Sequence, residues 1–189
     1  MHTNVSVVHR DVKLDNILLE EGTRMVKLID FGFSVLVNAP NQRLKVFCGT
    51  PSYMAPEITR KNDYEGMPVD IWALGVLLYV MLTGTFPFRG TSEQDLYQRI
   101  QRGHYKSQHE SLNKGAEQLI RGCLEVDPRR RLQAQHLIKD PYVTCDDLRM
   151  TAFEMAGTLA RVNNIKTFKR DIIKIAHNKA VELLVSFTM

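Results

Sequence analysis

The octapeptide His9-Arg10-Asp11-Val12-Lys13-Leu14-Asp15-Asn16 decides the fold, together with two short motifs that follow it in the chain. The first, Asp30-Phe31-Gly32, comes after one short apolar segment, and the second, Ala55-Pro56-Glu57, closes the long loop beyond it. Taken singly, each motif has an ordinary structural explanation, as polar residues at the end of a strand or as a turn. Their shared order and spacing are far more specific than any of the motifs alone.

In this order the motifs match the His-Arg-Asp-x-Lys-x-x-Asn catalytic loop, the Asp-Phe-Gly motif and the Ala-Pro-Glu motif of protein kinases. The chain therefore resembles the C-terminal lobe of a eukaryotic serine/threonine protein kinase over residues 1–143. The resemblance implies a mainly α (α+β) fold, a kinase-like C-lobe with short β segments at the catalytic loop and with the N-lobe absent. Residues 144–189 are expected to form a helical C-terminal extension. An N-terminally truncated product or a gene fragment is the plain explanation of the absent lobe.

The resemblance assigns the residues of phosphoryl transfer. Asp11 would accept a hydrogen bond from the substrate hydroxyl and orient it toward the γ-phosphate of ATP. Lys13 would place a cation beside the transferring group, although a solvated surface lysine is the alternative explanation. In the family, the threonine that matches Thr50 hydrogen-bonds the catalytic aspartate and lysine, although a plain turn hydroxyl would explain Thr50 too. The predicted catalytic residues are Asp11, Lys13, Asn16 and Thr50.

The implied cofactors are ATP and Mg²⁺, an ion that prefers hard oxygen ligands. Asn16 supplies a neutral oxygen and Asp30 a carboxylate, so these are the predicted metal ligands. Leu18 would form the floor under the adenine, and Lys13 completes the predicted cofactor-binding set with Asn16 and Asp30. The implied partners are ATP and protein substrates with Ser or Thr acceptors.

The sequence also indicates the substrate class. Lys13 matches the serine/threonine kinases, since tyrosine kinases typically carry Ala-Ala-Arg or Arg-Ala-Ala in this loop. The stretch Gly49-Thr50-Pro51-Ser52-Tyr53-Met54-Ala55-Pro56-Glu57 agrees, because it resembles the serine/threonine form of the substrate-facing loop. Thr83-Gly84-Thr85-Phe86-Pro87-Phe88 resembles the calcium/calmodulin and AMP-activated kinase group.

Further residues match positions that hold the kinase C-lobe together. Asp70 matches an aspartate that holds the catalytic-loop backbone. Glu57 and Arg131 match a buried ion pair, and each should need the other, because an unpaired buried charge is costly. One departure is Val46, which stands where many relatives carry a phosphorylated threonine bound by the residue that matches Arg10.

Composition excludes several classes of protein. The 189 residues are 44% hydrophobic, with 25 Lys and Arg against 21 Asp and Glu, which excludes a mostly disordered chain and does not argue for nucleic-acid binding. Cys48, Cys123 and Cys145 lie far apart, so neither a disulfide framework nor a zinc site is expected. A reducing compartment fits this pattern, and the expected location is the cytoplasm, with the nucleus as the alternative.

The pattern along the chain predicts short β segments at residues 5–8 and 25–29 and a long loop over residues 33–57. Residues 68–83 are apolar on every side and are followed by Gly84, which predicts a buried core helix. Its uncharged stretch falls short of the about 20 residues that a bilayer span needs, so no membrane span is expected. Further helices are predicted from about residue 91 to Gly103, over residues 114–124 and over residues 133–139.

After about residue 146, apolar residues recur at helical spacing, with most lysines and arginines outside the stripe. Two amphipathic helices packed on the domain are the expected structure, and a regulatory partner is expected to bind through them. A basic helix of the membrane-surface or calmodulin-binding type is the alternative.

Two hypotheses for function remain. The first is a serine/threonine protein kinase fragment, which transfers the γ-phosphate of ATP to protein hydroxyls. The second is a noncatalytic interaction module or an inactive truncated kinase product, because the chain begins just before the catalytic loop and lacks the Gly-rich loop and the β3 lysine that a kinase needs. The intact Asp11, Lys13, Asn16 and Asp30 favour the first as family identity, and the absent N-lobe favours the second for this polypeptide by itself.

Overall fold

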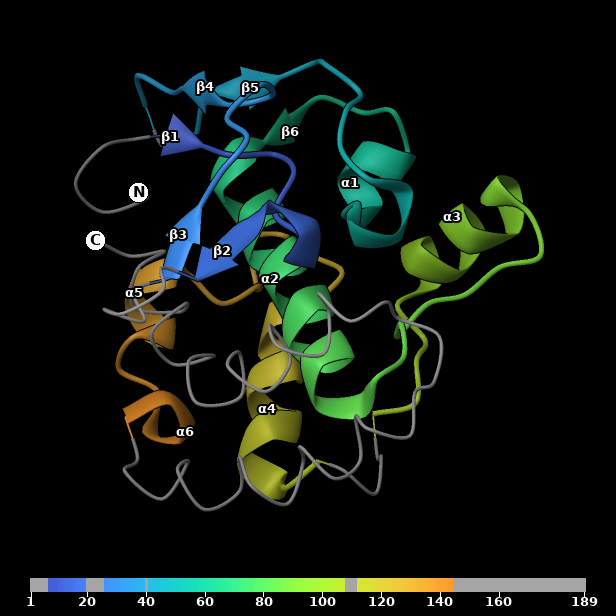
Figure 1. The fold of residues 1–189 in the computed structure, drawn as a ribbon. Helices are drawn as coiled ribbons and strands as arrows, with labels where there is room; N and C mark the ends of the chain where they lie inside the picture. The colour runs from blue at the N-terminus through green and yellow to red at the C-terminus, as the bar shows by residue number, and fades with distance from the viewer. Residues whose placement is uncertain (1–6, 20–25, 40, 108–111, 145–189) are drawn as a thin grey trace.

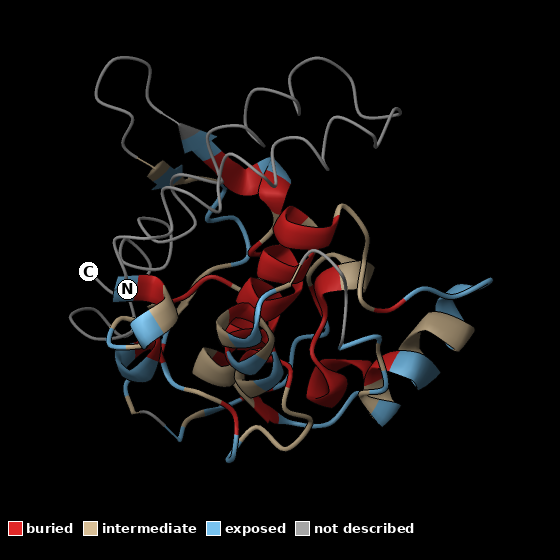
Figure 2. Cartoon of the chain, turned by 90° about the horizontal axis from the view of Figure 1, so that it is seen from below, coloured by how far each residue is buried: buried red, intermediate tan, exposed pale blue. Residues whose placement is uncertain are grey.

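Helix α2, Gly66–Thr83, runs through the middle of the fold, as Figure 1 shows for the computed structural model. The structure describes residues 7–19, 26–39, 41–107 and 112–144. Within α2, only Met67, Pro68 and Val80 are not fully buried, and Figure 2 shows most of the helix in the colour of buried residues. A helix without a polar face is stable when other elements cover it on every side. The predicted core helix is therefore confirmed.

The ends of α2 follow from its local sequence. Pro68 lies in the first turn, where its missing N–H leaves no helical hydrogen bond unmade, so the helix begins at Gly66, two residues before the predicted start. Gly84 ends it with a left-handed φ of 70°, and its N–H donates to the Val80 carbonyl at 2.8 Å. By length and a mean hydropathy of 1.6 this helix could cross a membrane, but 83% of it is buried inside the protein, which favours a core helix.

Helices α3 and α4 pack around this core. Helix α4, Lys114–Cys123, lies against α2 and buries one stripe at helical spacing, namely Ala116, Leu119, Ile120 and Cys123. Helix α3, Glu93–Arg102, begins after Ser92, whose hydroxyl accepts the Asp95 N–H at 3.2 Å, and ends at Gly103, as predicted. In Figure 1, α3 lies at the edge of the fold, beside α1, Pro56–Thr59.

The last two described helices are single turns. Helix α5, Ala134–Leu137, is shorter than the predicted helix over residues 133–139, and helix α6, Pro141–Thr144, follows the Asp140-Pro141 pair. The predicted helices after residue 146 lie outside the described residues. The same is true of part of the predicted β segments at residues 5–8 and 25–29.

Within the described residues, three pairs of short antiparallel strands connect segments of the chain. They join β1 (Val7–Val8) to β4 (Val35–Leu36), β2 (Ile17–Leu19) to β3 (Val26–Leu28), and β5 (Arg43–Leu44) to β6 (Tyr64–Glu65). The predicted long loop over residues 33–57 is therefore interrupted by short elements. It contains β4, β5, the 3-10 turn η2 (Pro51–Tyr53) and the start of α1. Strands of two residues show no alternation in the sequence, and they form because distant partners satisfy their backbone groups.

The ion pair between Glu57 and Arg131 joins α1 to the segment that follows α4. It is bidentate, with Nη1 2.7 Å from Oε1 and Nη2 3.0 Å from Oε2. The other guanidinium N–H groups donate to the carbonyls of Pro68 at 2.8 Å and Glu125 at 2.9 Å, and the guanidinium lies over the Trp72 ring at 5.1 Å. The Arg131 side chain has no exposed surface. The predicted buried pair is confirmed, and its charges are satisfied from several directions.

We expect Glu57→Gln or Arg131→Met to lower the free energy of unfolding by about 3–5 kcal/mol, because each leaves an uncompensated buried charge. The double variant should lose much less than the sum of the single losses, as measured by denaturant unfolding. The matched control is the exposed pair Arg43–Glu65, with 3.6 Å between its charged atoms. Its single variants should each cost at most about 1 kcal/mol. Additive losses at Glu57 and Arg131 would contradict the coupling.

Candidate active site

Asp70 of α2 anchors the catalytic loop, residues 9–16, to the core. The Asp70 side chain is fully buried, and its carboxylate oxygens accept the backbone N–H groups of His9 and Arg10, each at 2.8 Å. Arg10 adopts a left-handed φ of 67°, which is uncommon for a residue with a side chain. The predicted role of Asp70 in holding the loop backbone is confirmed by this geometry.

His9 joins the catalytic loop to the segment that carries Asp30. Its Nδ1 accepts the Asp11 N–H at 3.3 Å, and its Nε2 lies 3.1 Å from the Ile29 carbonyl. These partners require the hydrogen to sit on Nε2. The ring also meets the edge of Phe31, with 4.9 Å between ring centroids. No role was predicted for His9 by itself, although its place in the motif was the available signal.

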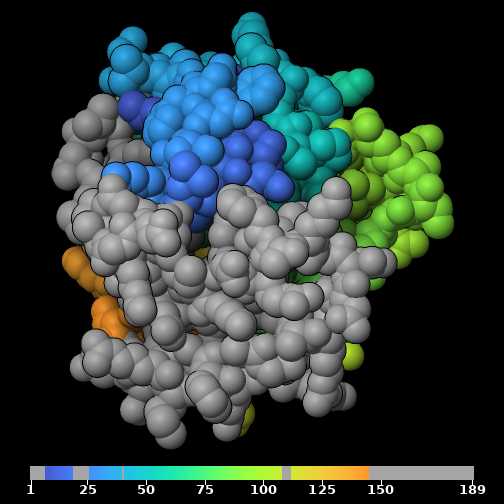
Figure 3. All heavy atoms as spheres, in the orientation of Figure 1, coloured from blue at the N-terminus to red at the C-terminus, as the bar shows by residue number. Residues whose placement is uncertain are grey.

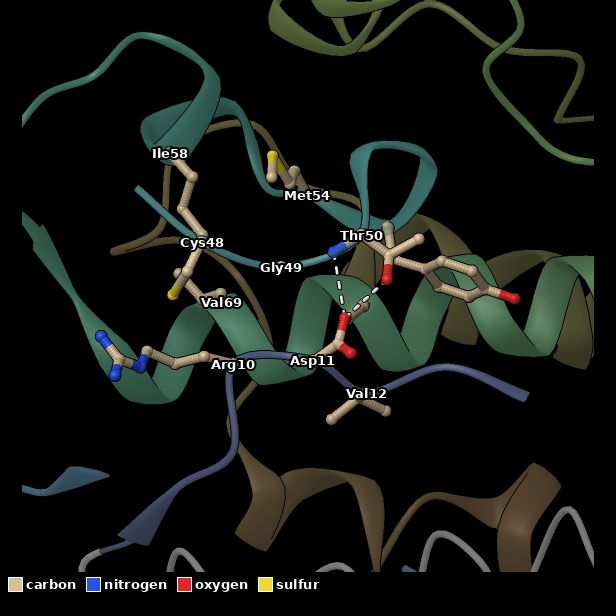
Figure 4. Close-up of a pocket in the computed structure, with 11 residues that line it drawn as sticks. Arg10, Asp11, Val12, Cys48, Gly49, Thr50, Met54, Ile58 and Val69 are labelled. Atoms are coloured by element: carbon tan, nitrogen blue, oxygen red, sulfur yellow. Dashed lines mark hydrogen bonds between the residues drawn. The ribbon is translucent and has the colours of Figure 1, made fainter. Parts of the chain in front are cut away.

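Asp11 is the centre of the candidate site. Its Oδ1 accepts the Thr50 N–H at 3.0 Å and the Thr50 hydroxyl at 2.7 Å, the two bonds drawn in Figure 4. Its Oδ2 accepts Lys13 Nζ at 2.6 Å and Asn16 Nδ2 at 3.2 Å. Lys13 Nζ also donates to Thr50 Oγ1 at 3.0 Å. The structure thus brings together the side chains of all the residues predicted to be catalytic.

The contacts of Asp11 determine its protonation state. Burial by itself raises the pKa of this carboxyl, but the hydrogen bonds from Lys13 and Thr50 and the charge of Lys13 outweigh burial. The net result is a pKa below the ordinary value of 3.8. Asp11 is therefore ionised at neutral pH and can accept a hydrogen bond from an incoming hydroxyl.

The segment that carries Thr50 is packed closely against the catalytic loop. Between the two lies a cavity of about 10 Å³, which has room for about one water molecule. Figure 4 shows Arg10 and Asp11 on one side of it and Cys48, Gly49 and Thr50 on the other. The Thr50–Asp11 contact is therefore part of a tightly packed arrangement.

Asn16 and Asp30 lie at the same end of the β2–β3 hairpin. Asn16 immediately precedes β2, and its carbonyl accepts the Ile29 N–H at 2.8 Å, one residue before Asp30. The amide nitrogen of Asn16 donates to the Asp11 carbonyl at 2.9 Å, which leaves the amide oxygen available as a ligand. Asp30 is exposed, has a left-handed φ of 61°, and accepts the Gly32 N–H at 3.2 Å.

This donor set fits a hard divalent cation that brings its own phosphate ligands. No group of three or more His, Cys, Asp or Glu side chains in the described part of the chain is arranged for a metal. Mg²⁺ is commonly held by one or two carboxylates, with phosphate oxygens and waters completing its shell.

Leu18 is 41% exposed on β2, while its neighbour Ile17 is buried, so β2 presents an apolar side chain outward.

A family model of the protein kinase domain matches residues 1–143. The chain belongs to the protein kinase family. It is 37% identical over 157 residues to the probable serine/threonine-protein kinase MARK-A of Dictyostelium discoideum, a match that covers 83% of this chain and 14% of that protein. It is also 40% identical over 142 residues to a SIK3 homologue of Danio rerio, covering 75% of this chain and 12% of that serine/threonine-protein kinase.

A third relative is the probable serine/threonine-protein kinase HSL1 of Saccharomyces cerevisiae, 38% identical over 144 residues, which are 76% of this chain and 9% of that protein. The kinase chain therefore spans a small fraction of the length of these relatives. The predicted family, a serine/threonine kinase of the calcium/calmodulin and AMP-activated group, is confirmed. The catalytic and ligand roles of individual residues stay predictions.

We expect Lys13→Met to raise the pKa of Asp11, because the hydrogen bond and the charge with which Lys13 opposes the effect of burial would be lost. The measurement is a titration of the Asp11 carboxyl carbon by NMR. The control is Lys45→Met, which removes an exposed lysine whose Nζ is 3.9 Å from Asp63, and it should leave the Asp11 pKa unchanged. An unchanged pKa in Lys13→Met would contradict the proposed electrostatics.

The same substitution has a consequence for stability. Because the folded-state pKa of Asp11 is lowered, its ionisation stabilises the fold above the unfolded pKa of about 3.9. This stabilisation is lost as the pH falls through the folded pKa. Lys13→Met should move that loss to higher pH.

Proposed function

We propose that this chain forms the catalytic-loop lobe of a serine/threonine protein kinase, which transfers the γ-phosphate of ATP to protein Ser and Thr hydroxyls. The observation that carries the proposal is the Asp11 carboxylate, which is ionised and held between Lys13 and Thr50. Phosphoryl transfer requires alignment and charge neutralisation more than covalent chemistry from the protein. An oriented carboxylate beside a cation provides both.

Asp11 has to exchange a partner before it can orient a substrate. An ionised carboxylate offers about four acceptor positions, and Asp11 accepts from Thr50 N, Thr50 Oγ1, Lys13 Nζ and Asn16 Nδ2. Lys13 is the mobile one among these donors, because its side chain is long and 21% exposed. When Lys13 moves from Oδ2 to the transferring phosphoryl group, it leaves a position on Asp11 for the acceptor hydroxyl.

Asn16 and Asp30 would hold Mg²⁺ through the Asn16 amide oxygen and the Asp30 carboxylate. When bound, the ion neutralises charge on the phosphate oxygens of ATP. Leu18 would supply the apolar floor under the adenine, and its outward position on β2 supports that role. Hydrogen bonds from Asn16 to Asp11 join the metal ligands to the residue that orients the hydroxyl.

We also propose that residues 1–143 are a kinase C-lobe and that residues 144–189 are a helical extension through which a regulatory partner binds. The motifs and the central helix support the first part. The second part rests on the apolar stripe in the sequence, since residues 145–189 lie outside the described residues. Protein substrates, ATP and a cytoplasmic location belong to the same proposal.

In a form of the protein that includes an N-lobe, Asp30→Asn should abolish turnover, because the proposed metal carboxylate is lost. Asp11→Asn should lower kcat about 10²–10⁴-fold while leaving nucleotide affinity nearly unchanged, because Asp11 addresses the hydroxyl and not the metal. The control is Asp63→Asn, an exposed aspartate, which should retain activity. Turnover and MgATP affinity are measured separately. Equal loss of nucleotide affinity at Asp11 and Asp30 would contradict this division of roles.

The 189-residue chain by itself should show no measurable phosphotransfer and at most weak MgATP affinity. Its sequence has no Gly-x-Gly pair to cover the phosphates, so the transition-state charge would face water, where electrostatic stabilisation is weak. The measurement is a phosphotransfer assay on the purified chain. Asp30→Asn serves as the control for contaminating kinases, and activity that disappears in this variant would show that the chain is catalytic alone.

A further inference from the structure

Tyr64 contacts the backbone of the segment that precedes Thr50 and holds it in place. Its hydroxyl donates a hydrogen bond to the Val46 carbonyl at 2.8 Å. Tyr64 is 2% exposed, whereas Val46 is 57% exposed, so the contact holds the backbone at Val46 and leaves its side chain in water.

The Tyr64 hydroxyl stays protonated, so it can donate a hydrogen bond. Burial raises its pKa above the ordinary value of 10.0, although the neighbouring Arg10 guanidinium acts in the opposite direction. Tyr64 therefore keeps its hydrogen at neutral pH. Breaking the part-buried hydrogen bond to Val46 would be costly, because the buried Tyr64 hydroxyl would lose its partner.

The other contacts of this region are weaker. Strands β5 and β6 pair in the register Arg43↔Glu65 and Leu44↔Tyr64, and the Val46 carbonyl lies two residues beyond the last pair. Two exposed ion pairs accompany the strands, Arg43–Glu65 at 3.6 Å and Lys45–Asp63 at 3.9 Å. Ion pairs in water contribute little. The buried Tyr64 hydroxyl is thus the strongest candidate for fixing the chain where the backbone pairing stops.

The path from Val46 to Thr50 is short and constrained. Cys48 is buried, and Gly49 has a left-handed φ of 111°. A Cβ at position 49 would lie 2.8 Å from the Arg10 carbonyl, so this turn passes directly over the catalytic loop. The next residue, Thr50, places its N–H and its hydroxyl on Asp11. We therefore expect a shift of the Val46 carbonyl to be transmitted to the Thr50–Asp11 contact.

We propose that Tyr64 is a positioning residue: by holding the Val46 carbonyl it fixes the path of residues 46–50 and so keeps Thr50 on the Asp11 carboxylate. Its importance for catalysis rests on the proposed kinase function. The geometry itself can be tested without any kinase activity, because the same contact protects the Thr50 amide hydrogen from exchange with solvent.

The test is Tyr64→Phe in the full 189-residue chain. We expect the Thr50 amide to exchange with solvent about two- to tenfold faster, the range for loss of one hydrogen bond. The amide at position 50 should also exchange faster in Thr50→Val, which removes the hydroxyl contact with Asp11. In the double variant Tyr64→Phe/Thr50→Val the acceleration should be smaller than the product of the single accelerations, because both changes act through the same contact.

The matched control is Tyr79→Phe. Tyr79 is another buried tyrosine, and its hydroxyl donates to the Lys106 carbonyl at 3.0 Å. Removing it deletes the same chemical group and lowers stability, but it should leave the exchange rate of the Thr50 amide unchanged. An unchanged exchange rate of the Thr50 amide in Tyr64→Phe, or an equal acceleration in Tyr79→Phe, would overturn the proposal.

A second variant covers the case in which Tyr64→Phe does not fold. Phenyllactic acid in place of Phe47 turns the Val46 carbonyl into an ester carbonyl, a weaker acceptor, and leaves Tyr64 intact. The Thr50 amide should exchange faster here too, and an unchanged exchange rate would overturn the proposal. In a form with an N-lobe, inactivity of the unmodified enzyme would count against the proposed function alone, since the exchange results do not depend on turnover.

Discussion

The Asp70 carboxylate accepts two adjacent backbone N–H groups of the catalytic loop, and the positions of the other site residues depend on that contact. Asp70 lies on a helix that is buried on nearly every side, so its carboxylate has no route to water. Without the His9 and Arg10 N–H groups it would be a buried charge short of donors, which is costly. The catalytic loop is therefore held against the core, because the buried Asp70 carboxylate needs these N–H groups as partners. Asp11 is the next residue after Arg10 in the chain, so the same contact helps to position it.

Among the described residues, each buried carboxylate is matched to a different kind of donor. Asp70 binds backbone N–H groups, Glu57 binds a guanidinium, and Asp11 binds an ammonium together with side-chain and backbone donors. The first two arrangements are geometrically closed and suit a structural role. The arrangement at Asp11 includes Lys13, which is partly exposed, so it is the one that can open to a substrate.

The sequence predicted the central helix, the Glu57–Arg131 pair and the cluster around Asp11, because each has a strong local or motif signal. It missed the strands within residues 33–57, since two-residue strands such as β5 have no readable period and depend on partners about 20 residues away, as Leu44 does on Tyr64. It also missed the role of His9. That role depends on tertiary contacts of the His9 ring with Ile29 and Phe31, which the local sequence does not reveal.

The four donors around Asp11 also bear on which molecules can serve as acceptors. A carboxylate with every lone pair engaged offers little to a water molecule, which would have to displace an existing partner without a compensating gain. A hydroxyl on a polypeptide substrate is also held by the other contacts of that polypeptide, so it can compete with the present donors for a position on Asp11. The resting arrangement thus offers water no open acceptor position on Asp11 as long as Lys13 stays on Oδ2.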